Sequence, residues 1–274
     1  MSHLICPVCR RALISGGKSM RCENGHTYDI AKQGYVNLLM SNKASVKRHG
    51  DDRAMVRART AFLEKGYYNC LRDAVCRAAV DHFSGESAEV TDVGCGEGWY
   101  TEAVKQALFK AGKGCAVCGI DISRDALIGF SRRDREAVLA VASVNSLPIA
   151  DRSQDIIINL FAPCDGAEFL RVLKPGGVVI RAVPMEDHLW GLKKAIYDKP
   201  YLNSAPEYSL PGADLLERIE IKDKLTLTGK EDIASLFLMT PYYYKTSRED
   251  QQKLESLDRL ETEISFCVFV MRKK

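Results

Sequence analysis

Four residues near the amino terminus have the side chains and the spacing of a metal site. Two residues separate Cys6 from Cys9, three separate Cys22 from His26, and twelve lie between the two pairs. Each close pair can chelate one ion, and three thiolates with one imidazole suit tetrahedral zinc. Four protein ligands leave no open position, so the pattern predicts a structural site that stabilises residues 1–36. The alternatives are cysteines that are merely buried, and a redox pair that would need only Cys6 and Cys9.

A second group of residues predicts a small-molecule site where a strand ends in a glycine-rich turn. The strand is expected at 89–93 and is followed by Gly94-Cys95-Gly96-Glu97-Gly98. Glycines allow a ligand to approach the backbone closely, and open α/β sheets bind ligands at the carboxyl ends of their strands. The spacing is not that of a dinucleotide site, because Trp99 stands where the third glycine would be. Asp92 and Glu97 would repel a pyrophosphate and favour a cationic ligand with an ammonium and a sulfonium.

The run from Asp92 to Gly98 resembles motif I of the class I S-adenosylmethionine-dependent methyltransferases. The resemblance implies an α/β, Rossmann-like fold with a seven-stranded sheet whose last strand is antiparallel. It also implies that Asp121 accepts the ribose hydroxyls and that Asn145 lies beside the adenine, although Ser143 stands where the family often has an acid. The cofactor residues implied so far are Asp92, Gly94, Gly96, Glu97, Gly98, Trp99, Tyr100, Asp121 and Asn145.

Hydrophobic periodicity predicts the elements that must position these residues. Two helices are expected at 53–64 and 67–82. Strands and helices then alternate, which indicates a parallel sheet covered on both faces. The strands are expected at 89–93, 115–120, 138–142, 155–160 and 178–183, and the helices at 99–111, 124–134, 165–173 and 188–196. In the tail, strands at 216–227 and 264–271 would pair antiparallel at the sheet edge, with a helix at 230–239 between them.

The chain is expected to have three parts. Residues 1–36 form a zinc-binding RNA-recognition module, residues 37–52 a basic linker and residues 53–274 the methyltransferase domain. A hydrophobic content of 46% and a charged content of 27% are ordinary for a globular protein. No apolar run approaches the ~20 residues of a membrane helix. The start lacks the pattern of a signal peptide, so we expect a cytoplasmic protein whose ten cysteines bind metal or are buried.

The zinc motif combined with motif I is similar to a narrower family, the RlmA-type 23S rRNA guanine-N1 methyltransferases. The similarity extends over nearly the whole chain, including residues 29–39, 50–52, 161–164 and 238–241. It implies methyl transfer from S-adenosylmethionine to N1 of a guanine in a hairpin of 23S rRNA. In this family the zinc module and the methyltransferase domain grip the RNA together, and the enzymes are homodimers. The similarity further implies that Tyr68 and His188 line the cofactor pocket.

Basic and aromatic residues in the first part of the chain fit RNA binding, although the net charge is only +3. Arginine and lysine contact phosphates, and tyrosine rings can stack on unpaired bases. The alternative is a solvated charged surface with aromatic core residues. The residues are Arg10, Arg11, Lys18, Arg21, Lys32, Lys43, Lys47, Arg48, Arg53, Arg57 and Arg59, with Tyr28, Tyr35, Tyr67 and Tyr68.

Methyl transfer requires the acceptor nitrogen within about 3–3.5 Å of the methyl carbon and an unstacked target base. A nearby group that takes the N1 proton would help. Asn159, Asp165 and Asp187 are the catalytic candidates, with Glu186 and His188 as further ones. Other functions remain open. The acceptor could be another RNA, a small molecule or a protein, or the chain could be a zinc-dependent RNA-binding protein with a relic cofactor site.

Overall fold

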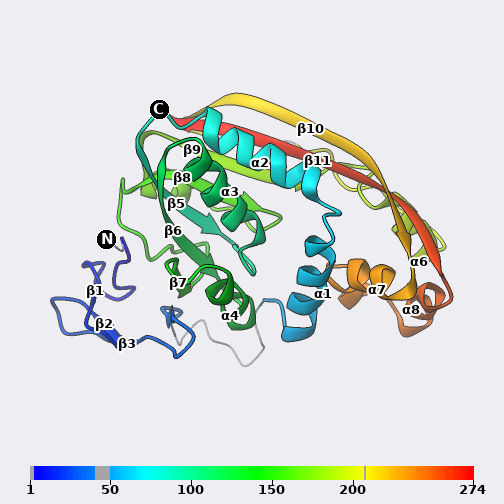
Figure 1. The fold of residues 1–274 in the computed structure, drawn as a ribbon, viewed down its shortest axis with the longest axis horizontal. Helices are drawn as coiled ribbons and strands as arrows, with labels where there is room; N and C mark the ends of the chain where they lie inside the picture. Colours follow the sequence, from blue (N-terminus) through cyan, green and yellow to red (C-terminus); the bar gives the residue numbers. More distant parts are fainter. Residues whose placement is uncertain (1–2, 41–49, 207) are drawn as a thin grey trace.

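The computed structural model describes residues 3–40, 50–206 and 208–274. Within them, an eight-stranded sheet runs in the order β10-β11-β9-β8-β5-β6-β7-β4, beside a three-stranded sheet β1-β2-β3 (Figure 1). The strands are β1 (Ile14–Ser15), β2 (Ser19–Arg21), β3 (Thr27–Asp29), β4 (Tyr35–Asn37), β5 (Ser87–Val93), β6 (Gly114–Asp121), β7 (Val138–Val141), β8 (Gln154–Leu160), β9 (Leu173–Pro184), β10 (Ala213–Thr228) and β11 (Arg259–Lys273). The helices are α1 (Arg53–Glu64), α2 (Asn69–Asp81), α3 (Trp99–Lys110), α4 (Arg124–Arg133), α5 (Gly166–Val172), α6 (Trp190–Ile196), α7 (Lys230–Leu238) and α8 (Arg248–Glu255), with a 3-10 turn at Tyr243–Lys245.

The sheet confirms the predicted topology and adds one strand to it. β5 pairs in parallel with β6 and β8, whereas β11 runs antiparallel between β9 and β10. The last strand is therefore the antiparallel one, and the predicted pairing of the two tail strands is confirmed. The eighth strand is β4, which pairs in parallel with β7 at the edge of the sheet.

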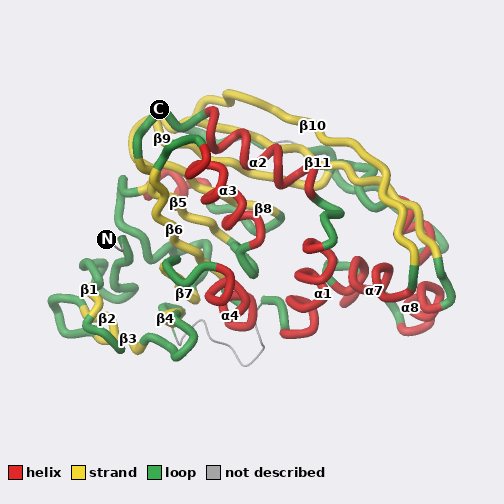
Figure 2. The backbone as a smooth tube through the Cα atoms, viewed as in Figure 1, coloured by secondary structure: helices red, strands yellow, loops and turns green. Residues whose placement is uncertain are grey.

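Alternating side chains of the central strands build a core on each face, as expected for a parallel sheet buried on both sides. Ile156 and Ile158 of β8 belong to the core beneath α2 and α3. Ile157, between them, belongs to the core on the opposite face, which α5 covers. Figure 2 shows α2 and α3 side by side over the strands. Side chains of β8 thus pack into the helical layers on both faces of the sheet. The carboxyl ends of the parallel strands lie along one side of the sheet.

The predicted elements and the observed ones differ mainly at their ends. The helix expected from residue 67 begins at Asn69, because Gly66 has φ +80° and the following residues form a turn. The helix expected from 188 begins at Trp190, because Leu189 has a left-handed φ of 57°. The sequence pattern did not predict β1–β4, since two or three residues are too few to show a period, and it did not predict α8, where Leu254 alone is buried and no apolar face forms.

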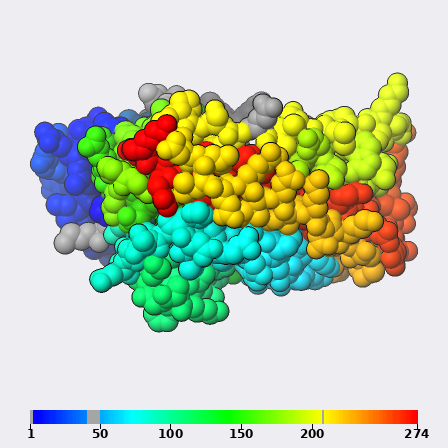
Figure 3. Space-filling model, turned by 90° about the horizontal axis from the view of Figure 1, so that it is seen from above, coloured from blue at the N-terminus to red at the C-terminus, as the bar shows by residue number. Residues whose placement is uncertain are grey.

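The amino-terminal module packs against the segment that follows β7. Leu4 forms an antiparallel bridge with Ile149, and the Ile5 amide donates to the Pro148 carbonyl at 2.9 Å. Figure 3 shows this module, in blue, at one end of the molecule.

The division at residues 36, 52 and 53 stays a prediction. Lys43, Lys47 and Arg48 lie outside the described residues. No helix in the described part of the chain is long and apolar enough to cross a membrane.

Candidate active site and zinc centre

The four predicted metal ligands converge on one point. The ligand atoms of Cys6, Cys9, Cys22 and His26 all lie within 4.8 Å of one another. The Cys9 and Cys22 sulfurs are 3.6 Å apart, and His26 Nδ1 lies 3.3 Å from Cys22 Sγ. Zn–S bonds of about 2.3 Å and Zn–N bonds of about 2.0 Å give a tetrahedron with edges near 3.5–3.8 Å. The residues therefore fit zinc, with His26 binding through Nδ1, and the closed ligand set makes the site structural.

The module's other polar residues divide into those that support the zinc site and those that face solvent. The Tyr28 hydroxyl lies 3.2 Å from Cys6 Sγ, so this ring supports the zinc site rather than offering a free face to a base. Arg10 pairs with Asp151 at 3.5 Å, and Arg11 with Glu23 at 2.9 Å. The exposed basic residues of the module are Arg10, Arg11, Lys18, Arg21 and Lys32.

A cavity of about 630 Å³ opens at the carboxyl ends of β5, β6, β7 and β8, where the sequence predicted a ligand site. The predicted cofactor residues that line it are Tyr68, Asp92, Gly94, Gly96, Glu97, Trp99, Tyr100, Asp121, Asn145 and His188. Gly98 does not line the cavity. It has φ +80° at the start of α3, and a Cβ there would lie 2.3 Å from the Phe130 ring. Gly98 therefore allows the turn to pack on α4.

Gly94 brings two chain segments together beneath the cavity. Its φ is +85°, and a Cβ there would lie 2.3 Å from the Ala162 Cβ. This close approach sets the turn after β8 directly against the turn after β5. The residues that follow β5 and those that follow β8 therefore lie against each other beneath the same cavity.

Three carboxylates face this space, and two of them, Asp92 and Glu97, have an oxygen that accepts no hydrogen bond from the described residues. Asp92 accepts a hydrogen bond from Thr101 through Oδ2, but its buried Oδ1 has no partner within the described part of the chain, nor has Glu97 Oε1. Asp121 accepts from the Gly96 and Ser123 amides at 2.9 and 2.7 Å. Burial, with added repulsion from Asp121 and Glu97, raises the pKa of Asp92 to about 7. Burial also raises the pKa of Glu97 and of Asp121. Buried unpaired acceptors of this kind fit a cationic ligand.

An aromatic cluster forms the opposite wall, around Phe266. The rings of Tyr68, Phe161 and His188 lie 5.0, 5.3 and 4.5 Å from the Phe266 ring. His188 Nδ1 accepts the Ser265 amide at 3.2 Å, and burial together with Lys193 lowers the pKa of His188 to about 3. His188 is therefore neutral and carries its proton on Nε2. It can donate a hydrogen bond at this wall.

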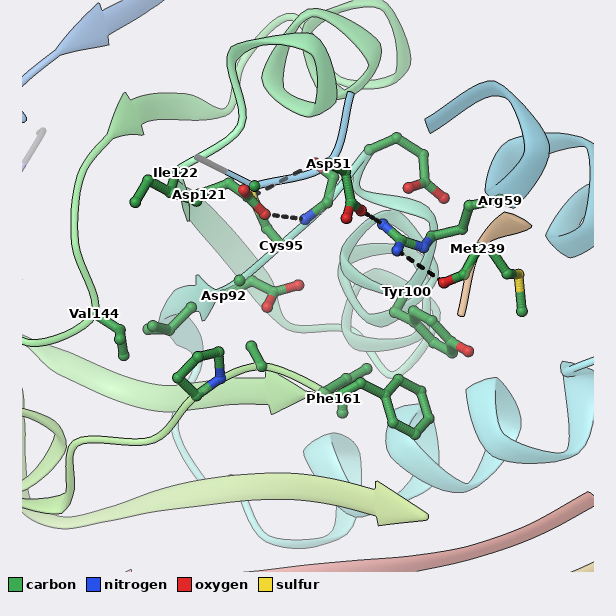
Figure 4. Close-up of a pocket in the computed structure, with 18 of the residues that line it drawn as sticks. Asp51, Arg59, Asp92, Cys95, Tyr100, Asp121, Ile122, Val144, Phe161 and Met239 are labelled. Atoms are coloured by element: carbon green, nitrogen blue, oxygen red, sulfur yellow. Dashed lines mark hydrogen bonds and ion pairs between the residues drawn. The ribbon is translucent and has the colours of Figure 1, made fainter. Parts of the chain in front are cut away.

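Phe161 is held in an unusual conformation at the end of β8. It has a left-handed φ of 57° and leaves 45% of its surface exposed while lining the cavity. A bulky residue with positive φ is uncommon, and such strain gathers at functional sites. In Figure 4, Phe161 lies across the space from Asp121 and Asp51. From the sequence, Phe161 stands out only through the resemblance, which places residues 159–163 where related enzymes contact the acceptor base.

The three catalytic candidates do not line the cavity. Asn159 is fully buried and its amide donates to the Val93 and Pro163 carbonyls at 2.8 and 3.1 Å, which holds the turn that contains Phe161. Asp165 caps α5 by accepting the Glu168 amide at 3.1 Å. Asp187 accepts the Trp190 amide through its backbone carbonyl at 3.1 Å. The structure thus gives Asn159 a positioning place and gives Asp165 a capping one.

We expect D165A to lower stability without slowing catalysis. The change removes an N-cap, which costs about 1 kcal/mol, and Asp165 itself does not line the cavity. Chemical denaturation should show the loss, and steady-state kinetics should show an unchanged kcat. A large fall in kcat at unchanged KM would instead mean that Asp165 takes part in the reaction.

Arg59 is the main site residue whose place differs from the prediction. It was grouped with the RNA-binding cations, but it lines the cavity and forms an ion pair with Asp51 (Figure 4). Asp51 and Gly50, from the expected linker, line the cavity as well. The available signal was the position of Arg59, next to Ala58 on the apolar face of a predicted helix.

The fold and this site define a class I S-adenosylmethionine-dependent methyltransferase with a zinc ribbon at its amino terminus. Residues 91–181 match a family model described as "Methyltransferase domain", and residues 4–46 match "RlmA, N-terminal". A chain of the structure titled "Complex between the Haloferax volcanii Trm112 methyltransferase activator and the putative methyltransferase" has the same fold. The TM-score is 0.50 at 18% identity, covering 82% of this chain and 96% of that one.

Curated relatives narrow the class further. The chain is 31% identical to the Bacillus subtilis (strain 168) protein named "Putative 23S rRNA (guanine-N(1)-)-methyltransferase YxjB", over 98% of this chain and 96% of that protein. It is 36% identical to "23S rRNA (guanine(748)-N(1))-methyltransferase" of Streptomyces fradiae, over 71% of this chain and 68% of that protein. The chain belongs to this family of 23S rRNA (guanine-N(1)-)-methyltransferases.

Proposed function

We propose that this enzyme transfers a methyl group from S-adenosylmethionine to N1 of a guanine in a hairpin of 23S rRNA. The observation that carries the proposal is one cavity with two unlike walls. Unpaired buried carboxylates form one wall, and a strained, half-exposed Phe161 beside neutral His188 forms the other. The first wall suits a cationic methyl donor, and the second suits a planar acceptor.

The cofactor supplies an electrophilic methyl group on a sulfonium, and the residues of the cavity would hold it in a fixed orientation. We place its ammonium at Asp92 and Glu97, its ribose hydroxyls at Asp121 and its adenine at Asn145. These residues lie at or just after the carboxyl ends of β5, β6 and β7 in that order, so the ligand would cross the ends of three adjacent strands. Gly94 and Gly96 leave room for this approach at the backbone.

The acceptor guanine would stack on Phe161 and receive a hydrogen bond from His188 Nε2. Stacking of a base on an aromatic side chain is worth about 1–3 kcal/mol, and it offsets part of the cost of unstacking that base from RNA. Asn159 would act as a positioning residue, because it fixes the turn from which Phe161 projects. The site therefore orients the two reactants and excludes water between them.

F161A is expected to lower the rate of RNA methylation about 10- to 100-fold and to leave the Kd for S-adenosylmethionine within about twofold. The lost ring is the acceptor platform, whereas the carboxylate wall is unchanged. Single-turnover methylation and calorimetric cofactor binding measure the two effects. F109A, which removes a phenylalanine that is 78% exposed on α3, is the matched control. Equal losses in both readouts would mean that Phe161 only supports the fold of the pocket.

The test of the function is methylation of 23S rRNA that lacks base modifications, with labelled S-adenosylmethionine. Nuclease digestion and mass spectrometry should then locate a single N1-methylguanosine. Label absent from RNA while the cofactor still binds would move the search to other acceptors.

The exposed arginines and lysines of the zinc module, with Arg53 and Arg57, would supply the contacts to the RNA phosphates.

We also propose that the enzyme is a cytoplasmic homodimer, as its similarity to the RlmA-type enzymes implies. β10 is an edge strand of the large sheet and exposes Leu215 and Leu216, which are 55% and 37% accessible. Unpaired edge strands with apolar side chains are common places for a second chain to pair. Light scattering after gel filtration tests the dimer, and a monomeric mass at micromolar concentration would refute it.

A further inference from the structure

Arg59 is the one lysine or arginine that lines the cofactor cavity within the described part of the chain. It projects from α1, whose neighbouring residues Ala58, Phe62 and Leu63 are buried in the protein. Its side chain is only 26% exposed, so the guanidinium is largely shielded from bulk water. The opposite charges there are Asp51, Asp92, Glu97 and Asp121.

Two contacts hold the guanidinium in place, but they use only some of its hydrogen-bond donors. It forms an ion pair with Asp51 and donates to the Met239 carbonyl at 3.5 Å. Burial disfavours its charge, but Asp51, Glu97 and Asp121 outweigh burial and raise its pKa. Of the five N–H donors of an arginine, the remaining ones have no protein acceptor among the described residues. The charged guanidinium of Arg59 therefore faces the cavity with N–H donors that are free to bind a ligand.

Asp51 is itself held in place, so it can orient Arg59. Its carbonyl accepts the Ser123 hydroxyl at 2.5 Å. Gly50, with φ +79°, lies so close to the Ile122 and Ser123 side chains that a Cβ there would come within 2.7 Å of Ile122. Residues 50 and 51 are thus fixed to the turn that follows β6. The ion pair spans from that turn to α1 over the glycine loop, where a Cβ on Gly96 would lie 3.8 Å from Arg59 Nη1.

This placement answers a charge problem that the proposed function raises. The amino-acid end of S-adenosylmethionine carries a carboxylate as well as an ammonium and a sulfonium. The cavity's carboxylates attract the two cations but repel the anion. A planar guanidinium is the protein group that best matches a carboxylate, because it donates two parallel hydrogen bonds.

We propose that Arg59 binds the α-carboxylate of S-adenosylmethionine and that Asp51 positions the guanidinium for this contact. The inference rests on the proposed cofactor site and assigns its anionic end. The cavity would then discriminate between the cofactor and analogues without a carboxylate. Arg59 would be a specificity residue for the cofactor rather than a contact for RNA.

The test compares three ligands by calorimetry on the full-length protein: S-adenosylmethionine, decarboxylated S-adenosylmethionine and 5′-methylthioadenosine. The variants are R59M, R59K, D51N and the control R77M, which removes an exposed arginine of α2 outside the cavity. We expect R59M to weaken binding of the intact cofactor about 10- to 100-fold, the usual scale for a charged hydrogen-bonded contact. Binding of the other two ligands should change less than about twofold. R59K and D51N should give intermediate losses.

The ligand set separates the failures. Wild-type protein that binds the intact and decarboxylated cofactors equally well would overturn the role of Arg59. So would an R59M protein that loses both of them equally, since that pattern means a damaged pocket. Wild-type protein that binds none of the three ligands would overturn the proposed function and this inference with it.

Discussion

C22S is expected to release the zinc, unfold the amino-terminal module and weaken S-adenosylmethionine binding, although no zinc ligand lines the cofactor cavity. Metal binding contributes about 10 kcal/mol or more to small zinc modules, so the loss of one ligand should unfold this one outright. The module's buried residues Leu4, Cys6 and Leu13 share a core with Leu147 and Ile149. Unfolding the module would expose that core.

The effect should reach the cofactor through the segment that follows β7. Ser143, Val144 and Asn145 line the cavity, and the next residues are held by the module. The Ile5 amide donates to the Pro148 carbonyl, and the Ala150 amide donates to the His3 carbonyl, both at 2.9 Å. Glu168 and Arg171 of α5 still hold Leu147 and Ile149, but without the two bonds from the module the ligand must supply more of the order of this segment. An ordering cost of about 1.4 kcal/mol would weaken binding roughly tenfold.

Three measurements on C22S check this coupling: zinc content by mass spectrometry, thermal unfolding and the Kd for S-adenosylmethionine. C115S is the matched control, because Cys115 is a half-buried cysteine of β6 outside the zinc cluster. Full loss of zinc with an unchanged Kd would show that the module and the cofactor segment are independent.

Lowering the pH from 7.5 to 6 is expected to weaken S-adenosylmethionine binding roughly eightfold, because Asp92 gains a proton. Its pKa in the free enzyme is about 7, chiefly through burial, so the ionised fraction falls from about three quarters to about one tenth. A cationic ligand binds the ionised form, and binding should therefore release a proton. At the upper limit of 7.5 most of the ligand's own ammonium is still charged, since α-amino groups titrate at about 7.7–8.0.

Two variants test the assignment to Asp92. D92N should bind the cofactor weakly at every pH and lose most of this pH dependence. T101V removes the hydrogen bond that lowers the pKa of Asp92, so the midpoint should move to higher pH. An unchanged midpoint in T101V would mean that another carboxylate titrates.

The same shift has a consequence for stability. Folding raises the pKa of Asp92 from 3.8, so the folded protein holds a proton that the unfolded chain has released between about pH 4 and pH 7. The contribution of this group to stability is therefore greatest below its ordinary pKa and is lost as the pH rises through 7. We expect ligand-free D92N to be more stable than the wild-type protein at pH 7.5. The carboxylate thus lowers the stability of the free enzyme in exchange for cofactor binding.

The sequence by itself determined the features that depend on local spacing. Cys6, Cys9, Cys22 and His26 are paired closely enough to indicate chelation, and the structure brings them to one point. The strand and glycine turn at 89–98 indicated the class of cofactor, and helical periodicity predicted α1 from Arg53 to Glu64. Such features are visible because each one completes its geometry within one turn, one strand or one helix.

Only the tertiary structure decided which polar residues outside the local motifs meet at the cavity. Asp165 looked catalytic by position but caps α5, while Arg59 looked like a surface cation but turns inward to Asp51. Phe161 gains its place from contacts with Phe266, more than a hundred residues later in the chain. The docking of the zinc module on the segment after β7 likewise joins distant residues. Long-range packing and charge pairing fix these side chains, and neither leaves a period or a spacing in the sequence.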